Sequence, residues 1–532
     1  MLQAECAGPS ATARCRRYCR LWHGASGCLL VAFIQCGCAS AKPAVAPSNA
    51  SARLAAADAQ VRAGCFDCLA SALQEYSNLR SVATVADAGS IGAARSAALL
   101  AIRERELGTA DSGYLARARE IVAANPRTQA TLGALLDMAD TLPVRGGVTQ
   151  VSDDVALLRN QTALQNRDLW TVQLRAHAND DALSAYVWLA FNCAYVPNVD
   201  HAVAEWLTFE PVWRDTPLVA LKAATCGSKT DNPSLEPLLV NDPRFVEVHY
   251  FLSLGLAYTG RIDSAMDHLL SAYGWRRDWP AVTSALGDDY VVLEDFDRAI
   301  DFIDRTLALV PRYPKAILSK AKTLTYAGRY VDSLQVVDQL LAQKSLVGDA
   351  RYWRALDEEA LSRYDEAWAD IELANKELFN AAVPKLAGII AYHRKQLDVS
   401  RDEFELSLRR GRDDCETGFY LGVVLGEQGT WMRTADVLID AVACFEKLET
   451  KLYEEMANIR ASTQPPDRQT RQIKRREAEI ATNRRLIVTA WYNTAVSYFS
   501  LSKEEEARQF ADKVIADDEF GERARQLLMR LR

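Results

Sequence analysis

The sequence predicts an all-α protein built as an α-solenoid, in which antiparallel helix pairs stack side by side. One observation is a fixed spacing. Small residues recur in equivalent helical segments at Ala265, Ala299, Ser333 and Ala367, and each position number exceeds the previous one by 34. The other is composition: only 26 Gly and 17 Pro interrupt 532 residues rich in Ala, Leu, Arg, Glu and Asp, a mixture that favours helix. Stacked helix pairs require a fixed period, since neither helix of a pair buries its apolar stripe alone.

The segment 1–38 is interpreted as an export leader. Four arginines between positions 14 and 20 precede a short apolar run, CLLVAFI at 28–34, and small residues follow that run. This is the layout of a secretory signal, and the apolar run is too short to span a bilayer as a helix.

The end of the leader resembles the processing site of bacterial lipoproteins. Cys38 follows Gly37 and precedes small residues, and in that family such a cysteine is lipidated and becomes the first mature residue. The match departs from the family at Gln35, where Leu is preferred. The resemblance implies an exported, membrane-anchored periplasmic lipoprotein, lipidated at Cys38, with residues 39–54 as a flexible tether. An ordinary secretory signal cut near Ala41 and a cytoplasmic protein with a misassigned start are the alternatives.

Residues 55–240 are expected to form divergent helical repeats. Phe66 at a turn and Ala72 in the following helix fit a degenerate helix pair, and the run LSAYVWLAFNCAY at 183–195 resembles a first helix. The register is poorer here than further along the chain, and no long alternation of polar and apolar residues indicates strand.

The segment 246–449 carries the most regular repeats. One of them holds five characteristic residues: Gly287, Tyr290, Phe296, Ala299 and Pro311. These residues match the pattern of the tetratricopeptide repeat (TPR) family, which the chain resembles over residues 246–532, in seven repeats of which one is interrupted. The repeat around Gly388 falls one position short of strict register.

The resemblance implies how such a chain acts. In the family, the first helices of the repeats line a concave groove that binds peptides or partner helices. Its register places these residues in the groove: Tyr250, Tyr258, Asp288, Lys322, Tyr326, Tyr352, Lys385 and Tyr392. Tyrosine suits such a surface because it combines apolar area with a hydroxyl group and loses little entropy on binding.

Residues 450–486 are predicted to form an extended helical hairpin that protrudes from the array, before a last repeat at 487–532. Two prolines, Pro465 and Pro466, forbid one unbroken helix, so two neighbouring helices are expected to lengthen into antiparallel arms. The return arm is basic, with Arg468, Arg471, Lys474, Arg475 and Arg476 close together. Such a run is typical of a solvated, salt-bridged face, and a docking arm for an acidic partner is the alternative.

Charge and motifs argue against several classes of protein. The net charge of −8 gives no general basic face for nucleic acid. Half of the 12 cysteines lie in the leader, between Cys6 and Cys38, and the others are too sparse for a disulfide scaffold. Cys65 and Cys68 form a CxxC motif, but Ala-rich helix surrounds it instead of the strand-to-helix setting of a redox pair, and no second ligand pair for zinc follows.

The predicted function is a non-enzymatic protein–protein interaction scaffold associated with the cell envelope, without catalytic residues, metal or cofactor. Its expected partners are other proteins or peptides and, through the lipid, a membrane, but not nucleic acid. Two alternatives stay open. One is a helical enzyme or thiol-redox protein that uses Cys65 and Cys68, with the repeats as an accessory module, and the other is a cytoplasmic regulator.

Overall fold

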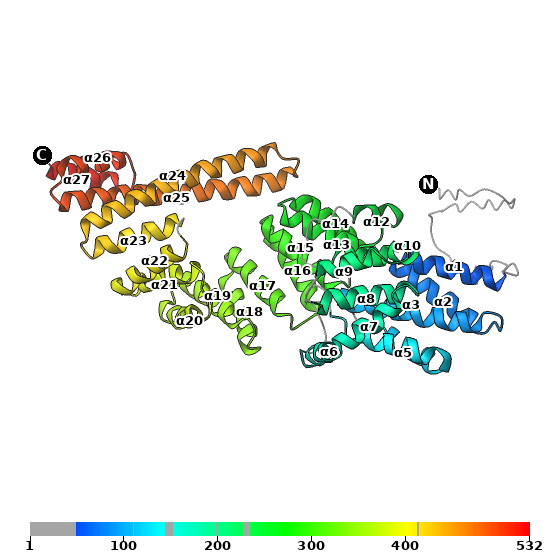
Figure 1. The fold of residues 1–532 in the computed structure, drawn as a ribbon. Helices are drawn as coiled ribbons and strands as arrows, with labels where there is room; N and C mark the ends of the chain where they lie inside the picture. Colours follow the sequence, from blue (N-terminus) through cyan, green and yellow to red (C-terminus); the bar gives the residue numbers. More distant parts are fainter. Residues whose placement is uncertain are drawn as a thin grey trace, which may run out of the picture. The chain divides into compact units, whose positions relative to one another are not determined.

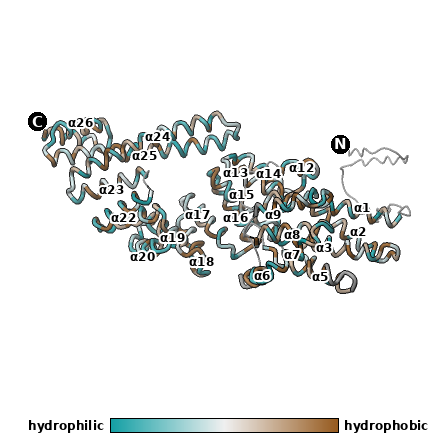
Figure 2. The backbone as a smooth tube through the Cα atoms, in the orientation of Figure 1, coloured by the Kyte–Doolittle hydropathy of each residue, from teal (hydrophilic) through white to brown (hydrophobic). Residues whose placement is uncertain are grey.

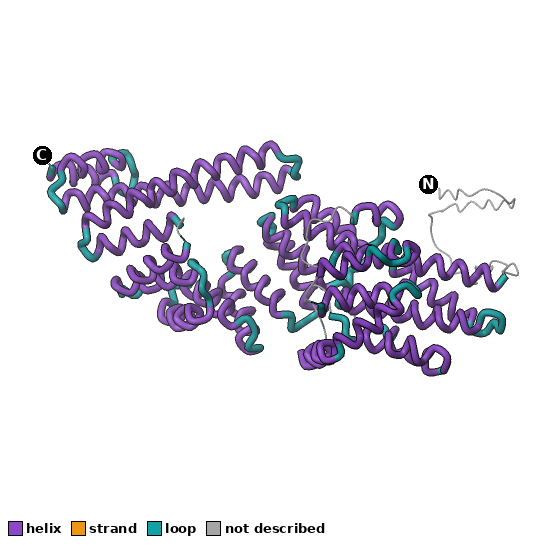
Figure 3. The backbone as a smooth tube through the Cα atoms, in the orientation of Figure 1, coloured by secondary structure: helices purple, strands orange, loops and turns teal. Residues whose placement is uncertain are grey.

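The computed structural model describes residues 49–109, 111–143, 153–196, 199–226, 235–411 and 414–531. Every regular element in these residues is a helix (Figures 1 and 3), which confirms the all-α fold. The predicted leader, with the lipidation site Cys38, lies outside the described residues, as does the tether up to position 48. Helix α1 already begins at Ala50, inside the predicted tether, and Asn49 caps it by accepting the backbone N–H of Ser51.

The helices before position 242 are α1 (Ala50–Ala63), α2 (Phe66–Leu79), α3 (Ala86–Leu107), α4 (Tyr114–Ala123), α5 (Pro126–Asp140), α6 (Asp153–Gln165), α7 (Arg167–His177), α8 (Ala182–Tyr195), α9 (Val199–Trp206), α10 (Pro211–Arg214), α11 (Pro217–Ala224) and α12 (Glu236–Asn241). In this part, α8 is the organising helix. Its residues from Ala182 to Asn192 are all buried, and it contacts α3, α5, α7, α9, α10 and α11. A helix that is apolar on every face must be enclosed, so the region predicted as divergent helical repeats packs around α8.

The repeat array follows, with α13 (Val246–Tyr258), α14 (Ile262–Trp275), α15 (Pro280–Val292), α16 (Phe296–Leu309), α17 (Pro314–Tyr326), α18 (Tyr330–Ala342), α19 (Val347–Ala360), α20 (Tyr364–Glu377), α21 (Ala382–His393), α22 (Leu397–Arg410) and α23 (Cys415–Glu427). Each helix contacts the next one along the chain, and the first helices α15, α17, α19, α21 and α23 also contact one another in series. The array helices carry both hydrophobic and hydrophilic residues (Figure 2), and the core is a row of small clusters between neighbours.

The turns inside successive helix pairs share one conformation. One residue of each turn has a positive φ: Gly260, Glu294, Gly328, Ser362 and Lys395. Their position numbers rise by the same interval as the small residues, except that the last step is shorter by one. The turns thus confirm both the period and the short repeat. Glycine adopts this conformation freely, whereas an L side chain pays roughly 1–2 kcal/mol for it.

Small residues let the helices of a pair approach closely. The four residues that defined the period, from Ala265 to Ala367, are fully buried. A Cβ atom on Gly388 would lie 2.7 Å from the ring of Phe404, and one on Gly287 would lie 2.7 Å from Ile303. The predicted residue types are therefore a packing requirement of the helix pair.

The chain ends with α24 (Trp431–Ala461), α25 (Pro466–Ser500), α26 (Glu504–Val514) and α27 (Gly521–Arg530). The long helices α24 and α25 run antiparallel and form the predicted hairpin (Figure 1), with the two prolines at its turn. Between the arms, a cluster holds the hairpin together: Leu448, Leu452, Met456, Ile473 and Ile480. None of the helices in the described part of the chain combines the length and apolar character that crossing a bilayer requires.

The basic return arm of the hairpin pairs with acidic residues of the chain itself. The ion pairs are Arg468–Asp263, Arg471–Asp295, Arg475–Glu294, Arg476–Glu294 and Arg476–Glu455. The nitrogen–oxygen distance is 2.6 Å between Arg476 and Glu294, and 3.2 Å between Arg471 and Asp295. The arm is thus salt-bridged, but partly to the array, which lies far from it in the sequence.

Candidate partner-binding surface

Six of the eight residues predicted for the groove lie in chain order on neighbouring first helices. They are Asp288 on α15, Lys322 and Tyr326 on α17, Tyr352 on α19, and Lys385 and Tyr392 on α21. We call the side chains that α15, α17, α19, α21 and α23 contribute to this row the first-helix surface. Asp288 and Tyr326 are exposed, and the other four are half-buried. Because each of these helices contacts the next, side chains at equivalent positions form one continuous strip.

One end of the first-helix surface is acidic. The Oδ1 atom of Asp288 accepts a hydrogen bond from the hydroxyl of Ser319 at 2.8 Å. Burial raises the pKa of Asp288, and the Ser319 hydrogen bond and the charge of Lys322 oppose this only in part. The side chain of Asp289 is 7% exposed, and burial together with the charge of Asp288 raises its pKa to about 7. A cation placed beside this carboxyl pair would relieve the repulsion between the two groups.

The middle of the surface is aromatic. The ring of Tyr326, a residue that is 48% exposed, lies 6.3 Å from the ring of Phe296 and 5.5 Å from that of Trp353. The ring of Tyr352 meets Trp353 edge-on at 5.6 Å, and the amine of Lys322 lies 5.4 Å from the Trp353 ring centre. Burial raises the pKa of Tyr352, so its hydroxyl stays a hydrogen-bond donor. These contacts hold the rings in place, and we call Tyr326, Tyr352 and Trp353 the aromatic platform.

Lys385 lies beyond the aromatic residues and is paired with acids. Its amine lies 2.6 Å from Glu416 and 3.0 Å from Asp414. Burial tends to lower the pKa of Lys385, but the charges of these two carboxylates outweigh burial and raise it. Glu359 lies near the same group, and burial and the charge of Glu416 raise its pKa. The single cation is thus shared among several carboxylates, and the local charge is negative.

Tyr392 extends the surface toward α23. Its hydroxyl donates a hydrogen bond to Glu427 at 2.6 Å. Burial and this hydrogen bond raise the pKa of Tyr392 to about 12. Next to it, His393 stacks on Tyr364 with ring centres 4.6 Å apart, and burial lowers the pKa of His393.

Tyr250 and Tyr258 do not join the other six residues. Tyr250 is 9% exposed and its ring lies 5.0 Å from that of Trp279. Tyr186 of α8 and Lys222 of α11 line the same small pocket as Tyr250, so the N-terminal helices cover a position that the repeat register leaves open. Tyr250 is thus a packing residue, contrary to the prediction. Tyr258 is 79% exposed at the end of α13 and takes part in none of the contacts described above.

Several residues of the surface were not predicted from the sequence. Trp353, Glu359, Glu416 and Tyr420 lie on the first helices α19 and α23, and the ring of Tyr420 stacks on that of Phe404 at 5.9 Å. Glu359 could have been found, because it follows Tyr352 by about two helical turns and so shares its face of α19. No residue of α23 was assigned to the groove from the sequence, so no such signal pointed to Glu416 or Tyr420.

Three disulfides pair all six cysteines of the described residues. They are Cys65–Cys68, Cys193–Cys226 and Cys415–Cys444. The last two pairs have sequence separations of 33 and 29, close to one repeat, so each joins residues that the helical packing brings together. That spacing was the sequence signal, and a low cysteine density did not exclude isolated cross-links.

The helix pairs, their constant period, the recurring left-handed turn and the small residues at the pair contacts occur together in this chain. The chain has the tetratricopeptide-repeat fold. Neither a family model nor a curated protein matches it.

Several solved TPR structures are similar to the chain. The crystal structure of YrrB, described as a TPR protein with an unusual peptide-binding site, is 16% identical, with a TM-score of 0.30, over 42% of this chain and 97% of that chain. A TPR protein from Parabacteroides merdae is 15% identical, with a TM-score of 0.33, over 54% and 98%. The APC/C hetero-tetramer Cut9–Hcn1 is 12% identical, with a TM-score of 0.39, over 91% and 96%. These TM-scores are low, so the TPR assignment rests on the period, turns and packing of this chain.

Proposed function

We propose that the chain is a protein–protein interaction scaffold that binds a segment of a partner protein along the first-helix surface. The supporting observation is the continuous row from Asp288 to Tyr392, in which fixed aromatic rings alternate with carboxylates. Rigid tyrosine and tryptophan side chains contribute much binding energy at low entropic cost.

The charge of the surface specifies the partner segment. Among the residues described above, the carboxylates of Asp288, Asp289, Glu359, Glu416 and Glu427 outnumber the amines of Lys322 and Lys385. Lys385 is already engaged by Glu416 and Asp414. The best-fitting segment therefore carries Lys or Arg side chains for the carboxylates and apolar side chains for the aromatic platform. Electrostatic complementarity of this kind sets orientation and speeds association.

Binding of defined peptides tests this proposal. Fluorescein-labelled peptides of equal length and apolar content, with net charges from negative to positive, are titrated with the purified protein and followed by anisotropy. Cationic peptides are expected to bind, and the affinity should fall as salt rises. Tyr326→Ala should weaken binding roughly tenfold, as loss of one aromatic anchor does. Tyr258→Ala is the matched control, because this exposed tyrosine lies outside the surface. Equal loss in both variants, or preference for anionic peptides, would contradict the proposal.

We further propose that this scaffold works in the cell envelope as an exported, lipid-anchored protein. Two observations support it. The segment 1–38 has the layout of a signal that ends at Cys38, and the described cysteines are all in disulfides, which persist mainly in oxidising compartments. Metabolic labelling with palmitate and membrane fractionation test this, with Cys38→Ala as the variant that should lose both label and membrane association. A wild-type chain that stays unlabelled in the cytoplasmic fraction would refute it.

A further inference from the structure

The disulfide between Cys65 and Cys68 differs from the other two in its setting. Cys65 caps the N-terminus of α2, and Cys68 lies in the first turn of the same helix. The other disulfides close loops roughly ten times longer. A cross-link within one helical turn constrains the unfolded chain least. A stabilising role therefore explains this disulfide less well than it explains the other two.

The two sulfur atoms are not equivalent. The Sγ atom of Cys65 accepts a hydrogen bond from the backbone N–H of Cys68 at 3.0 Å, and it lies at the positive end of the α2 dipole. Cys65 is 4% exposed, whereas Cys68 is partly exposed. A thiolate formed at Cys65 would be stabilised by this hydrogen bond and by the helix, and Cys68 is the sulfur that an incoming thiol can reach.

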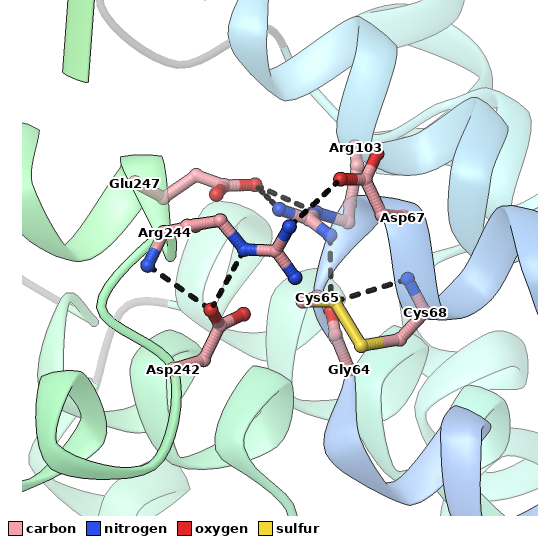
Figure 4. Close-up of a disulfide and its surroundings, with 8 residues drawn as sticks. All are labelled: Gly64, Cys65, Asp67, Cys68, Arg103, Asp242, Arg244 and Glu247. Atoms are coloured by element: carbon pink, nitrogen blue, oxygen red, sulfur yellow. Dashed lines mark hydrogen bonds and ion pairs between the residues drawn. A yellow bond between two sulfur atoms is a disulfide. The ribbon is translucent and has the colours of Figure 1, made fainter. Parts of the chain in front are cut away.

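A carboxylate from a distant part of the chain lies beside the pair (Figure 4). One oxygen of Asp242 and the two sulfur atoms all lie within 4.8 Å of one another. The Oδ1 atom of Asp242 accepts the backbone N–H of Arg244 at 3.0 Å, whereas Oδ2 is buried and has no hydrogen-bond partner. A buried acceptor without a partner is costly, and a thiol proton from the reduced pair would satisfy it.

The other charged groups near the disulfide form hydrogen bonds and ion pairs with neighbouring residues. Arg103 donates to the carbonyl oxygen of Gly64 at 2.9 Å and to Glu247 at 2.6 Å, which fixes the backbone directly before Cys65. Arg244 lies 3.9 Å from both Asp242 and Asp67. The guanidinium groups face the site together with these carboxylates (Figure 4), so a thiolate here is surrounded by compensated charge.

We propose that Cys65 and Cys68 form a thiol–disulfide exchange site that oxidises paired cysteines of a partner protein. A partner thiolate attacks the Sγ atom of Cys68, the bond between Cys65 and Cys68 breaks, and Cys65 leaves as a thiolate with the bonding electrons. The second partner thiolate then attacks the partner sulfur, and Cys68 leaves. The partner gains a disulfide and loses two electrons, which reside in the reduced pair. Asp242 accepts the thiol proton of reduced Cys68 and returns it to that sulfur.

The first test compares the three disulfides within one protein. The purified full chain is equilibrated in glutathione buffers of increasing reducing strength, quenched with acid and alkylated, and the cysteines are quantified by mass spectrometry. Cys65 and Cys68 should become alkylated under conditions that leave Cys193–Cys226 and Cys415–Cys444 intact. Equal or greater resistance of the Cys65–Cys68 bond would overturn the proposal.

The second test separates the roles of the two sulfurs. In Cys65→Ser, whose serine keeps the helix cap, oxidised glutathione should accumulate as a mixed disulfide on Cys68. In Cys68→Ser, buried Cys65 should trap about tenfold less, because access limits exchange. Equal trapping would show that the pair is only a local cross-link. Asp242→Asn should change the pH profile of the exchange rate while circular dichroism stays unchanged; an unaltered profile would remove Asp242 from the mechanism.

Discussion

Gly388 shows what a single residue contributes to this fold. Its missing side chain admits the ring of Phe404, which a Cβ atom would meet at 2.7 Å. We expect Gly388→Ala to lower the free energy of unfolding by about 1–3 kcal/mol, the range for overpacked cores. Gly133, within α5, has no neighbour within 4 Å of its added Cβ, so Gly133→Ala should raise stability by about 0.5–1 kcal/mol through helix propensity. Urea unfolding of both variants measures the contrast; a stabilised Gly388→Ala would contradict the close packing.

The raised pKa of Asp289 predicts that the stability of the protein depends on pH. Its folded pKa of about 7 lies above the ordinary carboxyl value of 3.8, so the folded state binds its proton more tightly than the unfolded state. Stability from this group is therefore complete below about pH 4 and is lost as the pH rises toward 7. Asp289→Asn, which mimics the protonated group, should match the wild type at pH 4 and exceed it at pH 8.

The control for this pH dependence is Asp297→Asn, because that side chain is exposed on α16. Chemical denaturation at both pH values measures the difference between the variants. If Asp289→Asn were less stable than the wild type at pH 8, burial would not be what perturbs this carboxyl group.

In the turn before α16, one residue combines a left-handed backbone conformation with ion pairs to α25. Glu294 has φ of 60°, and Ser362 has the same angle in the equivalent turn of a later pair. Only Glu294 also pairs with Arg475 and Arg476. Ser362→Gly should stabilise the protein by roughly 1 kcal/mol by removing the left-handed strain. Glu294→Gly removes the same strain but also the ion pairs. Its unfolding temperature should therefore rise less than that of Ser362→Gly, or fall. Equal gains would mean that the ion pairs contribute nothing.

The elements that follow from local spacing were predictable from the sequence. The four evenly spaced small residues fixed the helix pairs, and Pro465 and Pro466 placed the hairpin turn. The packing around α8 was not predicted, because an apolar helix does not specify which neighbours enclose it. Tyr250 fits the repeat register, yet covering helices from outside the array decide its burial. Contacts between distant segments, such as Arg468 with Asp263, have no periodic signal at all.

At the scale of the whole molecule, the ion pairs between α25 and the turn before α16 predict a response to salt and charge. Arg476→Glu should release the return arm from Glu294, and the added change Glu294→Arg should restore the contact. Spin labels on unnatural side chains at the exposed positions Thr470 and Asp297 measure the distance between the two segments. The distance should increase in the single variant and at high salt, and return in the double variant. A constant distance in every case would show that the ion pairs do not hold the arm.

Through these ion pairs, α25 connects the end of the array to its beginning. The helices from α17 to α23 lie, in chain order, between the two points that the arginines of α25 connect, and serial repeats bend by small rotations at each contact. A ligand that bends those repeats is therefore expected to strain or break the ion pairs between α25 and the turn before α16. We therefore expect that occupancy of the first-helix surface and the ion pairs between α25 and the turn before α16 affect each other.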